Sequence, residues 1–143
     1  MERVFNAPQE RVFRAYVDPK AIVEWWGPRR YVTTVEMLEA KVGGRWRFVQ
    51  RDASNDKRLF AFHGVFHECT SPSRIVQTFE FEGTPGHVVL TIYTFEDIGG
   101  SKTKVIADSV FASQKARDGM VRAGAESGAR EGWERLEEWA AKQ

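Results

Sequence analysis

The hydrophobic positions near the N-terminus recur at the spacing of an α-helix. After a short strand over residues 3–6, four apolar residues fall one, three and four positions apart and would line one face of a helix that begins at Pro8. They are Val12, Phe13, Tyr16 and Val17. Asp18-Pro19 then provides an N-cap and a first residue for a second helix, which Gly27-Pro28 ends. The sequence therefore predicts two short helices before residue 30.

From Tyr31 to Ala112 the pattern changes to β-branched and aromatic runs separated by turn residues. The turn clusters are Gly43-Gly44, Ser54-Asn55-Asp56, Ser71-Pro72-Ser73, Gly83-Thr84-Pro85-Gly86 and Gly99-Gly100. These short connections predict six antiparallel strands in a meander. Such a sheet twists and curls, and its apolar face needs a helical cover.

Alternation along these strands separates an aromatic face from a polar one. The faces that we expect to point inward carry Trp46, Phe48 and Gln50, then Phe60, Phe62, Gly64 and Phe66, and then Gln77, Phe79 and Phe81. Buried amides need hydrogen-bond partners, so Gln50 and Gln77 are candidates for a polar contact with a ligand.

Two registers remain open for the strands within residues 88–111. One places Thr91, Tyr93 and Phe95 inward together with Val105, Ala107 and Ser109. Leu90 and Ile92 favour the opposite register, and a single bulge would exchange the two faces. We favour the first.

The last segment, residues 113–143, has the composition of a helix that breaks near Gly119 or Gly124. Gly124, Gly128 and Gly132 fall four residues apart and would share one face of this helix. Each glycine in a helix interior costs about 1 kcal/mol relative to alanine. Either a close approach to the sheet or a space left for a guest molecule would offset that cost.

Composition limits the classes of function. The 143 residues, 42% of them hydrophobic, suit one domain over residues 1–143, and a formal net charge of +1 gives no general attraction for nucleic acid. Cys69 is the single cysteine, which excludes an internal disulfide and fits a reducing compartment. No leader or membrane span is recognisable, so we expect a cytoplasmic protein.

Candidate chemistry is sparse. His63 and His67 lie four residues apart on a predicted strand, which separates them by roughly 13 Å, so no metal site is expected. Glu68, at the end of an apolar face, could act as an acid or base, although an ion pair with Arg74 is the simpler role. Tyr93, if it points inward, could bind or protonate a ligand carbonyl. No motif indicates a cofactor.

Taken together, these motifs resemble the START-like, or SRPBCC, superfamily of helix-grip folds, in the Aha-type branch named after the activator of the Hsp-ninety chaperone ATPase. The resemblance covers the whole chain. It rests on Val12-Phe13-Arg14-Ala15-Tyr16, Asp18-Pro19, Trp25-Trp26-Gly27-Pro28, Gly43-Gly44-Arg45-Trp46, Gly64-Val65-Phe66 with Glu68 and Pro72, and Gly132-Trp133. It implies an α+β fold in which a curved antiparallel sheet, two short helices and a long C-terminal helix enclose a cavity.

The chain departs from that pattern at two positions. Ser109 stands where relatives often carry a histidine, and Gln77 stands where an aromatic residue is usual. Roles that family members assign to those positions therefore do not transfer. The superfamily also has diverse functions, so the resemblance implies a small apolar ligand rather than a particular reaction.

The leading hypothesis is a binding protein for a small hydrophobic ligand such as a lipid, a polyketide-like molecule or an aromatic metabolite. The expected walls are Trp26, Trp46, Phe48, Phe62, Phe79, Tyr93, Met120, Gly124 and Gly128, with Gln50 and Gln77 orienting the ligand. A cyclase- or aromatase-like enzyme using Tyr93 or Glu68 is one alternative. A protein-interaction, stress-response or co-chaperone-like module acting through Trp25 and Trp139 is another. The surface aromatics and sheet edges also leave a homodimer open.

Overall fold

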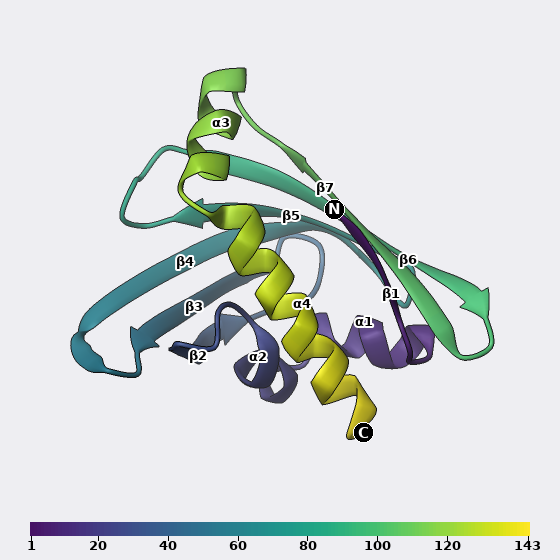
Figure 1. Ribbon diagram of the computed structural model, residues 1–143. Coiled ribbons are helices and arrows are strands. Elements are labelled where there is room, and N and C mark those ends of the chain that lie inside the picture. The colour runs from purple at the N-terminus through teal and green to yellow at the C-terminus, as the bar shows by residue number, and fades with distance from the viewer.

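One curved sheet with helices on one of its faces makes up the protein (Figure 1). The computed structural model describes residues 1–143. Its elements are β1 (Glu2–Phe5), α1 (Gln9–Val17), α2 (Pro19–Trp25), β2 (Tyr31–Leu38), β3 (Arg45–Asp52), β4 (Asn55–Thr70), β5 (Arg74–Phe81), β6 (Val88–Gly99), β7 (Lys102–Val110), α3 (Gln114–Arg122) and α4 (Ala125–Ala141). This arrangement is the predicted α+β helix-grip fold.

The two short helices form where the sequence predicts them. α1 begins at Gln9, one residue later than predicted, because Pro8 has an extended ψ of 151° and is the N-cap rather than the first helical residue. The side chain of Asp18 accepts a hydrogen bond of 2.9 Å from the backbone N–H of Lys20 and so caps α2. Gly27, at φ 83°, turns the chain away after α2.

The six predicted strands form the antiparallel meander β2 to β7, and β1 adds to the free edge of β7. β1 pairs along its whole length, since Glu2 lies opposite Ile106 and Phe5 opposite Thr103. The sheet order is therefore β1-β7-β6-β5-β4-β3-β2. We call the side on which the helices lie the inner face.

The favoured register of β6 and β7 is the one found. Thr91 and Phe95 are buried on the inner face, and Tyr93 packs against the core between them. Tyr93 lies opposite Ala107 on β7, which also packs against the core. Leu90 and Ile92 consequently occupy the outer face of the sheet.

The C-terminal segment is two helices rather than one, and the break is at Gly124. This glycine has φ 84° and ψ 19°, a left-handed conformation that ends α3 and precedes α4. Figure 1 shows α4 crossing the inner face on the same side as α1 and α2, with α3 at the far end from those helices. No helix combines the length and the hydropathy needed to span a bilayer.

Candidate functional site

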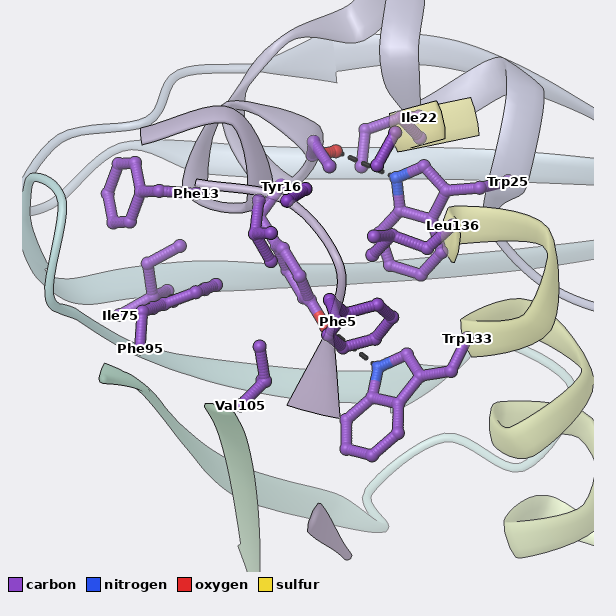
Figure 2. Close-up of a cluster of buried hydrophobic side chains, with 14 of the residues drawn as sticks. Phe5, Phe13, Tyr16, Ile22, Trp25, Ile75, Phe95, Val105, Trp133 and Leu136 are labelled. Atoms are coloured by element: carbon purple, nitrogen blue, oxygen red, sulfur yellow. Dashed lines mark hydrogen bonds between the residues drawn. The ribbon is translucent and has the colours of Figure 1, made fainter. Parts of the chain in front are cut away.

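One end of the inner face is closed by side chains from three helices. Trp133 and Leu136 of α4 are 6% and 0% exposed, and Trp133 meets Phe5 edge-to-face with ring centroids 5.8 Å apart. Figure 2 shows Trp133 hydrogen-bonded to Tyr16 of α1 and Leu136 beside Trp25 of α2. This end of the molecule is therefore a packed hydrophobic core.

Tyr16 and Tyr93 lie at the boundary of this core. The Tyr16 hydroxyl accepts a hydrogen bond of 2.9 Å from Nε1 of Trp133, and its ring centroid lies 4.8 Å from that of Tyr93. Burial raises the pKa of Tyr16 well above its ordinary value. Burial also raises the pKa of Tyr93 to about 12. Both hydroxyls therefore stay protonated at neutral pH.

The N-terminal half of α4 does not close the inner face in the same way. Ala129 lies one helical turn before Trp133 on the same face, yet Ala129 is exposed whereas Trp133 is buried. Ala125, a further turn back, is also exposed, and α3 contains no buried residue. The helix thus covers the inner face only with its C-terminal half.

Aromatic side chains continue along the inner face beyond the packed core. Trp26 stands with its ring centroid 5.1 Å from Phe48 and 5.2 Å from Phe62, and Phe62 lies 5.5 Å from Phe79. Trp46 and Phe48 are buried, whereas the other three are half-buried. The structure therefore brings the predicted aromatic wall residues together, with Trp26, Phe62 and Phe79 the more accessible of them.

The two predicted polar residues have different surroundings. Gln50 is 3% exposed, and its Nε2 donates a long hydrogen bond of 3.5 Å to the carbonyl oxygen of Trp26. Its amide occupies the place of a Cβ at position 27, and the φ of 83° at Gly27 independently favours glycine there. Gln77 is half-buried opposite Thr91, and its side chain has no hydrogen-bond partner.

The expected glycine strip is corrected by the structure. Gly124 is not in a helix interior and carries no helix penalty there, because it forms the left-handed junction between α3 and α4. A Cβ at Gly128 would lie 3.6 Å from Cγ of Pro28, and one at Gly132 would lie 3.4 Å from the backbone nitrogen of Gly27. The close approach is therefore to the segment after α2, not to the sheet.

Met120 likewise differs from the expectation. It is a half-buried residue of α3, on the other side of the Gly124 break from Gly128. If Met120 encloses a ligand, it does so through the position of α3 and not through that of α4.

Glu68 lies on the opposite face of the sheet from Tyr93. Alternation from Phe62 through Phe66 predicts Glu68 on the inner face, but the register shifts between Phe66 and Glu68. Glu68 consequently pairs with Val76 on the outer face, where it accepts a hydrogen bond of 3.2 Å from Nε of Arg74. The sheet separates the two candidate catalytic groups, so they do not act together on one ligand.

Two open hollows stand out on the molecule. One, of about 520 Å³, lies beside the junction of α3 and α4 and is lined mostly by charged and polar residues, including Glu126, Arg130 and Glu131. The other, of about 420 Å³, lies beside α1 and includes Phe13, Val17 and Cys69. Neither lies between the inner face and α4, where the sequence predicts the cavity.

The prediction that Trp25 and Trp139 form a surface for a protein partner is wrong for Trp25. Trp25 is 4% exposed and its Nε1 donates a buried hydrogen bond of 2.8 Å to the carbonyl oxygen of Ala15 (Figure 2). Trp139 is half-buried beneath the guanidinium of Arg14, whose Cζ lies 5.4 Å from the ring centroid. Trp25 is thus a core residue and offers no surface for a partner.

Arg135 is a structural residue that the sequence reasoning missed. Its Nη1 donates to the carbonyl oxygen of Gly27 at 2.9 Å and its Nη2 to that of Glu24 at 2.8 Å. It thereby ties α4 to the carbonyl end of α2. A basic side chain is a common partner for such carbonyls, but the sequence alone does not show which helix end an arginine over a hundred residues away will reach.

The fold and the inner face define a START-like helix-grip protein. The chain belongs to the family described as Activator of Hsp90 ATPase homolog 1-like protein, whose profile matches residues 6–140. Among curated proteins, none matches the sequence well enough to count as a relative.

Solved structures share the fold. Protein CV1439 from Chromobacterium violaceum is 25% identical, with a TM-score of 0.80 over 98% of this chain and 94% of that one. A protein from Arthrobacter aurescens is 23% identical, with a TM-score of 0.90 over 99% and 84% of the two chains. DynU16, a protein of the dynemicin biosynthetic locus, is 17% identical, with a TM-score of 0.70 over 97% of this chain and 45% of its own.

Proposed function

We propose that this protein binds a small apolar molecule, with a ring or a chain, between the inner face of the sheet and the N-terminal half of α4. The observation that carries the proposal is the contrast along α4, where Trp133 is buried but Ala129, on the same face, is exposed. Half-buried aromatic rings continue along the inner face beyond the packed core. A ligand there would remove this apolar surface from water.

In this proposal the direct walls are Trp26, Phe62, Phe79 and Tyr93. Trp46 and Phe48 support the ring of Trp26 from behind rather than contacting the ligand first. Hydrophobic burial of roughly 25 cal/mol per Å² would supply most of the affinity, with aromatic contacts adding to it. Tyr93 would contribute as a neutral hydrogen-bonding group.

Native mass spectrometry of protein purified from its own host tests the proposal most directly. We expect a defined added mass that denaturing extraction releases as an apolar compound. The same spectra report whether the protein is a monomer or a homodimer. A clean apo mass that persists after incubation with a library of hydrophobic metabolites would contradict the proposal.

A pair of substitutions then locates the ligand. Ala129→Leu places a larger side chain on the face of α4 that points to the proposed site, whereas Ser127→Leu places the same side chain on the side of α4 that lines the polar hollow. We expect Ala129→Leu to weaken binding of the fluorescent probe N-phenylnaphthylamine by about tenfold and Ser127→Leu to leave it unchanged. Equal affinities for the two variants would place the probe elsewhere.

A further inference from the structure

A row of polar side chains crosses the inner face within the proposed binding region. Gln77 on β5 lies directly opposite Thr91 on β6, and Thr91 lies directly opposite Ser109 on β7. We call these three residues the polar row. Tyr93 follows Thr91 by two positions on β6 and therefore points to the same face. Four hydrogen-bonding side chains from three neighbouring strands thus converge on one part of the sheet.

The polar row has no hydrogen-bond partner within the protein, unlike other inner-face hydroxyls. Thr103 donates to the carbonyl oxygen of Ala7 at 2.8 Å, and Thr33 donates to that of Trp26 at 3.0 Å. The side chains of the polar row and of Tyr93 form no hydrogen bond. Nevertheless, no fully buried side-chain nitrogen or oxygen atom lacks a hydrogen-bond partner. Their polar atoms therefore remain open to the space beside the sheet.

A purely hydrocarbon ligand would displace water from these groups and form no hydrogen bond with them. Removing a polar atom from water without a new hydrogen bond is unfavourable, so such a ligand would bind against that penalty. A ligand with its own donor or acceptor at this point would satisfy the polar row instead. The row consequently selects for polarity at one position of an otherwise apolar molecule.

No side chain on the inner face around the polar row carries a formal charge. The neighbouring inner-face residues are Phe66, Ile75, Phe79, Val89, Tyr93 and Ala107. The nearest cationic side chain on this face is Arg3 of β1, whose position lies opposite Val105, four residues or roughly 13 Å along β7 from Ser109. The α-ammonium of Met1 is closer, but it is exposed and already donates a hydrogen bond of 3.0 Å to the carbonyl oxygen of Ala107. The Arg3 guanidinium is directed over the ring of Phe5, away from the row. A carboxylate bound at the row would thus find no cationic side chain and no buried counter-charge.

We infer that the ligand carries a neutral hydrogen-bonding group, such as a hydroxyl or a ketone, which binds the polar row while its apolar part lies against the aromatic rings. This inference rests on the proposed function and names the chemical class of the ligand. The amide of Gln77 and the hydroxyls of Thr91 and Ser109 each offer both a donor and an acceptor, so alcohols and ketones are equally suited.

A matched series of bicyclic probes tests the inference by calorimetric titration: naphthalene, naphthol, methyl naphthyl ketone and naphthoate. We expect naphthol and the ketone to bind about tenfold more tightly than naphthalene, and naphthoate to bind more weakly than naphthol at pH 8. Tightest binding of naphthoate would overturn the inference, because it would mean that a charge is recognised. If none of the four probes bound, the proposed function itself would fail.

Three variants assign the preference to the polar row. Thr91→Val preserves shape and removes one hydroxyl, Ser109→Ala does the same at an exposed position that tolerates change, and Thr94→Val is the matched control on the outer face of β6. We expect the first two to reduce the advantage of naphthol over naphthalene by about threefold each, with naphthalene binding at least as tightly as to the wild type, and Thr94→Val to keep the full advantage. If the full advantage survived in both Thr91→Val and Ser109→Ala, the row would not be the recognition element, although apolar binding would still stand.

Discussion

The two halves of α4 differ in the size of the side chains on the face that points inward, and they have different structural roles. The C-terminal half places Trp133, Leu136 and Ala140 into the core, where all three are buried. The N-terminal half presents Ala125 and Ala129 on the same face, and both remain exposed. Large side chains fill the space between helix and sheet at one end, and small ones leave it unfilled at the other. The helix is thus anchored at one end and free to border a ligand at the other.

Truncation of the anchor should have the largest effect. Trp133→Ala removes the ring that meets Phe5 and the donor to Tyr16, and we expect it to lower the free energy of unfolding by about 3–5 kcal/mol in urea titrations. Met120→Ala, in α3, should lower it by less than about 1 kcal/mol. Similar losses from the two substitutions would remove the distinction between the two ends.

The next effect concerns Tyr93, at the boundary between the two ends. Its pKa is about 12 in the folded protein and about 10 when unfolded, so the folded state binds more protons between those values. The stabilisation is complete below pH 10 and is lost as the pH rises toward 12, by about 1.4 kcal/mol per pH unit. Urea midpoints measured from pH 9 to 11.5 should therefore fall more steeply for the wild type than for Tyr93→Phe. Parallel curves would mean that folding does not raise the pKa of Tyr93.

The smallest effect distinguishes the two glycines of α4. Gly128→Ala should raise the free energy of unfolding by about 0.5–1 kcal/mol, because the new Cβ meets only Cγ of Pro28, at an ordinary contact distance of 3.6 Å. Gly132→Ala should gain less, since its Cβ would lie 3.4 Å from the backbone nitrogen of Gly27. Thermal melts of the two variants measured side by side would show the difference. A larger gain at Gly132 would contradict the close packing at the anchored end.

Much of the fold is readable from local sequence because short-range physics sets it. The stripe around Phe13 and Tyr16, the Asp18 cap and the turn glycines each act within a few residues, and each is found as expected. The alternation that points Trp46, Phe48 and Gln50 inward is equally local.

The candidate site is less readable, because it depends on contacts between distant segments. The register shift after Phe66 moves Glu68 to the outer face and Cys69 to the inner one, and it arises where β4 pairs with β5. The glycines from Gly124 to Gly132 are regularly spaced in the sequence, but their surroundings differ. Gly124 forms the junction between α3 and α4, Gly128 faces the ring of Pro28, and Gly132 faces the backbone at Gly27.

By itself, the sequence determined the order of helices and strands, the inward faces of β3 to β5 and the membership of the family. Only the tertiary structure decided which hydroxyls of the inner face lack partners and which side of the sheet carries Glu68. The physical reason is that helix and strand periods are properties of neighbouring residues. Burial and hydrogen-bond satisfaction instead depend on which remote side chains arrive from the rest of the chain.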